Sequence, residues 1–268
     1  MRSKSIRFLS AAFVAATLFA CSSDSGTESG ADWAVLWVRE AAEFDALAMQ
    51  AYRAAADDLP RLIADRSWTA MPGQKNYGQL PPAIILDVDE TLLSNVGFQE
   101  ILVGPFENSD HDDWNATHEA AAIPGAATFA KMAREQGVEL FFLTNRPCQI
   151  KTGVAGSCPQ ETVTVQDLNE AGIPADTDHV MLANERSHWD REKFTRRNLI
   201  AQNYRIVMVI GDDLSDFIPC VRKEVYEPCD EGATVASRRS QTELYSSYWG
   251  SGWYVLPNPM HGSWTTVE

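Results

Sequence analysis

The sequence predicts an α/β protein with a Rossmann-like, mostly parallel sheet and a small helical cap. Short apolar runs at 83–88, 138–143, 179–182, 206–210 and 253–256 are typical of buried parallel strands. Helical patterns separate several of these runs, and such alternation is typical of parallel α/β folds. With 268 residues, 45% of them hydrophobic, the chain can build one sizeable core.

The first helical region is expected at 32–65, which is rich in Ala, Leu, Met, Glu and Arg and has no proline before Pro60. It predicts one long helix or a helix pair. Residues 66–81 carry several prolines and glycines, and they predict a connector. Further helices are expected over 126–136, 161–171 and 190–202.

Residues 95–123 interrupt this alternation of strands and helices. They are rich in Asn, Asp and His, with isolated aromatic residues. Because the insertion follows the first strand, we expect it over the carboxyl ends of the sheet, where such folds bind ligands. The domain at 32–268 then consists of the helical segment 32–65, an α/β core at 83–94 and 124–268, and the cap insertion.

The amino terminus predicts export. Residues 1–20 have a basic start and an apolar run too short to cross a bilayer, as in a secretory signal peptide. The run ends before Cys21 in a pattern that resembles the bacterial lipobox, so we expect a lipid anchor on Cys21 and a flexible tether at 21–31. Ser22 favours the outer membrane by the same resemblance. An ordinary signal-peptide cleavage site is the alternative.

Four cysteines remain, at positions 148, 158, 220 and 229. An exported compartment permits disulfides, and four cysteines allow three connectivities. We predict the local pairs Cys148–Cys158 and Cys220–Cys229, because each lies in a loop-like stretch and closes a short ring. A zinc site is the alternative, although the spacing and the absence of a His cluster disfavour it.

The charge balance excludes one class of partner. The formal net charge is −15, and no basic run occurs outside the first few residues. A phosphate backbone needs a positive footprint, so binding to a nucleic-acid polymer is not expected. The sequence leaves the oligomeric state, including a homodimer, open.

Polar side chains follow three of the predicted strands. The first strand is followed by Asp87 and Asp89, the second by Thr144 and Asn145, and the fourth by Asp212, Asp213 and Asp216. Neighbouring carboxylates repel, so such a cluster needs a cation or a shared proton. A calcium loop is an alternative, but an EF-hand fails because Leu92 stands where its glycine would be. Ordinary caps and turns are the other alternative.

The order of these residues resembles the haloacid dehalogenase superfamily of phosphohydrolases. It is most similar to the class C acid phosphatases, which include bacterial lipoprotein 5′-nucleotidases. The motifs that carry the resemblance are Asp87-Val-Asp-Glu-Thr91, Leu143-Thr-Asn-Arg146, Lys193-Phe-Thr-Arg-Arg197, Gly211-Asp-Asp-Leu-Ser-Asp216, Leu256-Pro-Asn-Pro-Met260 and Gly262-Ser-Trp264. Two positions depart from the family pattern: Asp213, which is usually Asn, and His261, which is usually Tyr.

The resemblance implies a Mg²⁺-dependent acid phosphatase that hydrolyses small phosphomonoesters, with nucleoside 5′-monophosphates as candidate substrates. Asp87 is the expected nucleophile, which forms an aspartyl-phosphate, and Asp89 the expected acid and base. The implied Mg²⁺ ligands are the side chains of Asp87 and Asp212 and the backbone carbonyl of Asp89. Asp213 or Asp216 would act on the metal through water.

The remaining site residues are expected to meet the substrate. Thr144 offers a hydroxyl to a phosphoryl oxygen and Lys193 a charge to the equatorial oxygens. Trp114 is the first candidate for stacking on a nucleobase or aromatic leaving group. Asn145 and His261 are further candidate contacts. We expect Arg146 to be structural, and Phe98 and Phe106 to belong to the cap core.

A second hypothesis is a non-catalytic surface lipoprotein that binds a cation or another ligand in the same acidic pocket. The presence of every motif residue argues against it. Among enzymes, a phosphonatase, a dehalogenase or a phosphomutase are alternatives, and the expected acid–base role of Asp89 disfavours a dehalogenase. A phosphatase assay separates the enzyme from the binding protein.

Overall fold

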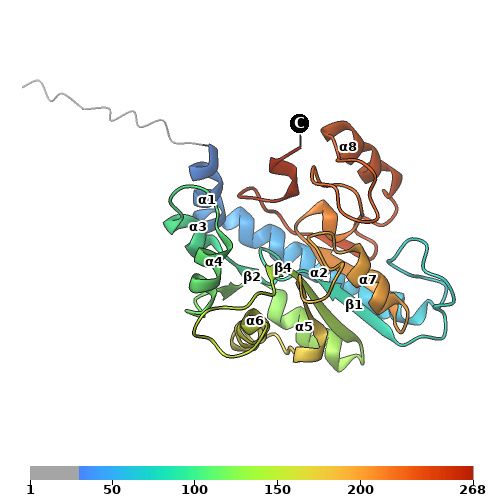
Figure 1. Cartoon of the computed structure of the whole chain (residues 1–268). Coiled ribbons are helices and arrows are strands. Elements are labelled where there is room, and N and C mark those ends of the chain that lie inside the picture. Colours follow the sequence, from blue (N-terminus) through green and yellow to red (C-terminus); the bar gives the residue numbers. More distant parts are fainter. Residues whose placement is uncertain (1–29, 268) are drawn as a thin grey trace, which may run out of the picture.

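The computed structural model describes residues 30–267, so the expected signal peptide, Cys21 and nearly all of the tether lie outside the described residues. A five-stranded sheet with the order β5-β4-β1-β6-β7 forms the centre (Figure 1). All its neighbouring strands are parallel, and the five predicted strands are all present. Their bounds are β1 Pro82–Leu86, β4 Glu139–Pro147, β5 Val180–Ala183, β6 Arg205–Gly211 and β7 Trp253–Val255.

Both faces of the sheet are buried, which explains the continuous apolar runs. In β1, Ile84 and Leu86 pack in one core cluster, on the side of the helical segment. Ala83 and Ile85 pack in the cluster on the other side, with Trp253. This alternation follows from the two-residue period of a strand.

The helical region at 32–65, expected as one long helix or a helix pair, is a pair: α1 spans Gly30–Glu40 and α2 spans Ala42–Ala64. The other helices of the core are α5 Ala126–Glu135, α6 Pro159–Glu170 and α7 Phe194–Ala201. The last begins later than predicted because carboxylates form turns in front of it. Asp190 accepts a bond from the backbone N–H of Glu192, and Glu192 accepts one from the N–H of Phe194.

The insertion contains α3 Val96–Ile101 and α4 Asn108–Asn115. Two short antiparallel strands, β2 Leu93–Ser94 and β3 Ala121–Ala122, close its base and were not predicted. Figure 1 shows α1, α3 and α4 gathered on one side of the molecule and α8, Val235–Leu244, on another. Short 3₁₀ helices occur at Thr177–His179 (η1), Leu214–Asp216 (η2) and Ser263–Thr265 (η3).

Both predicted disulfides, Cys148–Cys158 and Cys220–Cys229, are confirmed. The first closes the loop between β4 and α6, and the second closes a loop beyond η2. Within residues 30–267, none of the helices combines the length and the apolar character that crossing a bilayer requires.

Candidate active site

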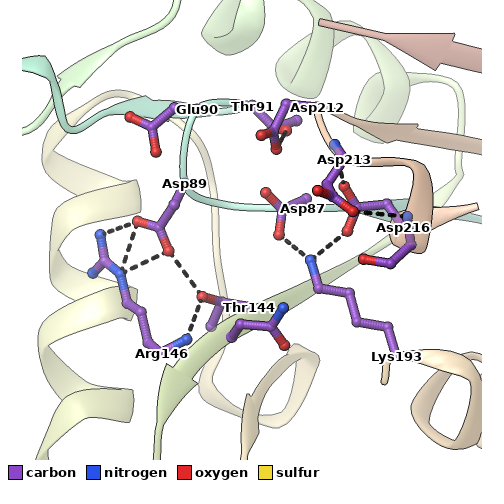
Figure 2. Close-up of polar contacts among 12 residues, drawn as sticks. Asp87, Asp89, Glu90, Thr91, Thr144, Arg146, Lys193, Asp212, Asp213 and Asp216 are labelled. Atoms are coloured by element: carbon purple, nitrogen blue, oxygen red, sulfur yellow. Dashed lines mark hydrogen bonds and ion pairs between the residues drawn. The ribbon is translucent and has the colours of Figure 1, made fainter. Parts of the chain in front are cut away.

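The carboxyl ends of β1, β4 and β6 bring the predicted residues together (Figure 2). Asp87 follows β1 directly, and its backbone N–H donates to the carbonyl of Ile210 in β6. The chain then turns sharply, with both Leu92 and Leu93 donating to the carbonyl of Val88. Glu90 lies in this turn at φ 57°, in the left-handed region. The turn thereby presents Asp87 and Asp89 at the sheet edge.

One half of the site is the Asp87 cluster, which we define as Asp87, Asp212, Asp216 and Lys193. Carboxylate oxygens of the three aspartates lie within 4.8 Å of one another. The buried Lys193 ammonium contacts Asp87 and donates to Asp216 Oδ1 at 2.6 Å. Burial raises the pKa of Asp87 to about 7, although Lys193 opposes this. Burial and the charges of Asp87 and Asp216 also raise the pKa of Asp212.

This half fits a divalent metal ion. Three carboxylates face a single ammonium, so the cluster holds an excess of negative charge, and its donors are hard oxygens of the kind Mg²⁺ prefers. Asp212 is oriented by the Thr91 hydroxyl at 3.0 Å and the Asn258 amide at 2.8 Å. Asp216 uses one oxygen for Lys193 and the other for the backbone N–H of Asp213, so it orients its neighbours.

Asp213 is engaged by the carboxyl-terminal tail. Its carboxylate accepts bonds from the backbone N–H of Ser263 at 2.5 Å, from the Ser263 hydroxyl at 2.7 Å and from the N–H of Ser215 at 2.9 Å. Burial opposes ionisation, but Arg222 and these bonds lower the pKa of Asp213 to about 2. Its side chain therefore anchors the tail over the site.

The other half is the Asp89 cluster, formed by Asp89, Asn95, Thr144 and Arg146. Arg146 donates to Asp89 Oδ1 from Nη2 at 2.8 Å and from Nε at 3.0 Å. The Thr144 hydroxyl donates to Asp89 Oδ2 and the Asn95 amide to Oδ1, both at 3.0 Å. Burial opposes ionisation, but Arg146, the charge of His111 and the Asn95 amide hold the pKa of Asp89 well below its usual range.

A cavity of about 530 Å³ opens from both halves of the site. The predicted contacts Asn145 and His261 line it. The Asn145 amide oxygen accepts a bond from Arg196 at 3.1 Å, and His261 Nε2 lies 3.0 Å from Glu90 Oε2.

The described residues that line this cavity do not include Trp114. Its side chain is 7% exposed, stacks on His111 and packs near Phe98 in the cap. The predicted stacking role of Trp114 is therefore not supported, because its ring serves the cap core. Phe106, expected in that core, is 44% exposed and lines the cavity.

The sequence argument missed two residues of the site. Arg146, which was expected to be structural, holds the predicted acid–base residue directly. Glu90 and Asn95 were not singled out, although Glu90 accepts two bonds from Asn95 and both line the cavity. Their place in the polar stretch after the first strand is the signal that could have found them.

A family model described as the haloacid dehalogenase superfamily, subfamily IIIB (acid phosphatase) matches residues 47–264. The chain belongs to this family. The resemblance found in the sequence, the fold class and the family are thereby confirmed.

Two solved structures of the class C acid phosphatase from Bacillus anthracis, one with tungstate bound, are 29% identical to this chain, with TM-scores of 0.69 and 0.70. Each match covers 87% of this chain and 86% of the other. The enzyme class expected from the sequence, a phosphomonoesterase, agrees with the family and with these neighbours.

Two curated plant proteins match a shorter region. The Stem 31 kDa glycoprotein of Glycine max is 27% identical over 143 residues, and Acid phosphatase 1 of Solanum lycopersicum is 29% identical over 141 residues. Each alignment covers 50% of this chain and 51% of the relative. The chain therefore spans about half the length of the curated relatives it matches.

Proposed function

We propose that this protein is a Mg²⁺-dependent acid phosphatase that hydrolyses phosphomonoesters through an aspartyl-phosphate on Asp87. The observation that carries the proposal is the convergence of Asp87, Asp212 and Asp216 within 4.8 Å, in contact with Lys193 and open to a cavity. The related Bacillus anthracis enzyme has been solved with tungstate, an oxyanion like phosphate.

Mg²⁺ would be held by the side chains of Asp87 and Asp212 and by the backbone carbonyl of Asp89. When bound, Mg²⁺ would neutralise the negative charges of the nucleophile and the phosphate, which otherwise repel each other. Lys193 supplies a further fixed charge at the same place, since its ammonium already contacts Asp87.

In the first step, an oxygen of Asp87 bonds to phosphorus and the bond to the ester oxygen breaks. The negative charge of the bound phosphate raises the pKa of Asp89, so that Asp89 enters this step protonated and gives the ester oxygen its proton. In the second step, Asp89 takes a proton from a water molecule that attacks phosphorus, which releases inorganic phosphate and restores Asp87. Thr144 is fully buried and donates its hydroxyl to Asp89 in the structure, so its expected bond to a phosphoryl oxygen would require that hydroxyl to turn away from Asp89.

Nucleoside 5′-monophosphates are the proposed substrates. A cavity of about 530 Å³ accommodates a small ligand, and the rings of Phe106, His261 and Tyr226 line it beside the polar Asn145. Stacking on such rings tolerates any base. A panel of nucleotides, sugar phosphates and aryl phosphates at several pH values tests this proposal, and higher kcat/KM on sugar phosphates would contradict it.

We also propose that the protein is exported and anchored to the cell envelope through a lipid on Cys21. The support is the signal-peptide and lipobox pattern of the sequence. Palmitate labelling and membrane fractionation of the native chain and of Cys21→Ser test it. Label on the native chain alone is expected, and equal membrane association of both would overturn the anchor.

The test of the phosphatase is Asp87→Asn, assayed on a chromogenic phosphomonoester. We expect turnover to disappear while the thermal unfolding transition remains cooperative. Asp57→Asn is the matched control, because Asp57 is exposed on α2 and distant in sequence from the site. EDTA should silence the native enzyme and Mg²⁺ should restore it. Native protein that turns over no phosphomonoester would instead support a cation-binding lipoprotein.

A further inference from the structure

A buried chain of charged side chains leads away from Asp89. Arg146, 3% exposed, directs its Nε and Nη2 nitrogens to Asp89 (Figure 2). Its third nitrogen, Nη1, donates to Asp167 Oδ2 at 2.8 Å and to the Thr164 hydroxyl at 3.3 Å. Asp167 and Thr164 stand three residues apart on α6, so they meet Arg146 from one helix face.

The chain of contacts continues into the cap. The other oxygen of Asp167, Oδ1, lies 2.6 Å from Nδ1 of His118. His118 comes between α4 and β3, where the insertion returns to the core, and its φ of 58° is left-handed. Its side chain is 23% exposed, whereas that of Asp167 is 1% exposed. The cap exit is thus connected to Asp89 through Asp167 and Arg146.

The geometry restricts Arg146 from both sides. One edge of the planar guanidinium faces Asp89, and the opposite nitrogen is held by α6. A planar group held at both ends has little rotational freedom, so the direction of its bonds to Asp89 depends on Asp167. The described residues that line the cavity do not include Asp167 or His118, so neither is placed to touch a substrate.

We propose that Asp167 and His118 are positioning residues for the acid–base step. Through Arg146 they hold the Asp89 carboxylate in line with the ester oxygen, and they couple the seating of the cap to proton transfer. The inference rests on the proposed function, since it presupposes that Asp89 gives a proton to the leaving group.

The test compares two esters by kcat/KM, which reports the steps up to the phosphoenzyme. A nucleoside 5′-monophosphate has a poor alkoxide leaving group that needs a proton, whereas 2,4-dinitrophenyl phosphate does not. For Asp167→Asn and His118→Ala we expect kcat/KM on the nucleotide to fall about tenfold, part of the roughly 10²–10⁴-fold effect of acid–base catalysis. On the dinitrophenyl ester we expect a change below about twofold.

Two further variants separate positioning from general damage. His118→Asn keeps a nitrogen donor and tolerates the left-handed backbone, so it should restore nucleotide hydrolysis. Asp112→Asn is the matched control, because the Asp112 carboxylate ties α4 to the Gln149 and Gln160 amides, at 3.0 and 2.8 Å, without touching Arg146. It should leave the ratio of the two esters unchanged.

Equal losses on both esters, or the same change of ratio in Asp112→Asn, would overturn the inference. Native protein that hydrolyses neither ester contradicts the proposed function itself, which is a distinguishable outcome. If Asp167→Asn does not fold, as judged by thermal unfolding, the more exposed His118 decides through His118→Ala and His118→Asn.

Discussion

Asp87 and Asp89 stand on the same short turn, yet the two halves of the site shift the pKa values of these carboxyl groups in opposite directions. In the Asp87 cluster three carboxylates face one ammonium, and burial raises the pKa of Asp87 to about 7. In the Asp89 cluster one carboxylate faces a guanidinium, a hydroxyl and an amide, and its pKa lies well below the usual range. Both residues are aspartates, so the difference between their pKa values comes from the balance of charges around each carboxylate.

The strand order explains the difference. β1 has β6 on one side and β4 on the other. The end of β6 supplies Asp212 and Asp216 to Asp87, whereas the end of β4 supplies Thr144 and Arg146 to Asp89. The first half therefore needs an added cation or a shared proton, and the second half is balanced by the chain itself.

The largest effect is expected from Lys193→Met. This change removes the ammonium that contacts the buried carboxylates of the Asp87 cluster, so we expect a loss of about 3–5 kcal/mol of unfolding free energy and at least about a thousandfold of turnover. Thermal unfolding with and without Mg²⁺ measures the loss of unfolding free energy, and Mg²⁺ should recover part of that loss. Arg146→Met keeps the proposed metal site, so Mg²⁺ should stabilise it only as much as it stabilises the native protein, whereas Lys193→Met should gain more than the native protein. Equal gains in both variants would erase the distinction between the halves.

Asp89→Asn should abolish proton transfer but keep the metal site. We expect kcat/KM on alkyl phosphates to fall by about 10²–10⁴-fold. Because the proposed ligand at this position is the backbone carbonyl, the rise of the unfolding temperature with Mg²⁺ should persist. A variant that is inactive and also insensitive to Mg²⁺ would place the Asp89 side chain in the metal site.

Asp212→Asn should instead weaken the binding of Mg²⁺. In the native protein, Mg²⁺ at about a hundred times its Kd should add about 2.7 kcal/mol of stability, and the variant should lose this gain. Without Mg²⁺ the variant should unfold at a higher temperature than the native protein, because one of the repelling carboxylates is gone. Thermal unfolding over a Mg²⁺ titration measures both, with Asp57→Asn as the control that retains the native response.

The sequence predicts the Asp87 half better than the Asp89 half. Asp87 and Asp212 each follow a long apolar run, and parallel strands end at one edge, so their convergence follows from the pattern. The pattern does not predict which carboxylate Arg146 binds, because the long side chain of an arginine after a strand can extend in more than one direction. Its direction depends on Asp167, which stands on a later helix.

The cap shows the same limit. Trp114 and Phe106 both lie in a polar stretch without a clear period, so the sequence does not tell which ring is buried. Packing between α4, α3 and the core decides it. Helix α8 was missed for a related reason: none of its described side chains is buried, so it has no apolar face to recognise.

The smallest predicted effect concerns His261, which joins the tail to the turn between the two halves. Burial opposes its charge, but Glu90 raises the pKa of His261 above its usual 6.5. A pKa raised on folding gives stability that is present below the unfolded value and lost as the pH rises through the folded value. The loss should be below about 1 kcal/mol, because the side chain is 42% exposed and such pairs contribute roughly 0–1 kcal/mol.

Unfolding free energies of the native protein and of His261→Gln, each measured below and above neutral pH, isolate this contribution. The native protein should lose its advantage over the variant at the higher pH. His188→Gln is the control, because His188 is 75% exposed and 3.7 Å from Glu227. An advantage that grows with pH would mean that neutral His261 is the form that binds Glu90, and would reverse the assigned charge of the contact between the tail and the turn.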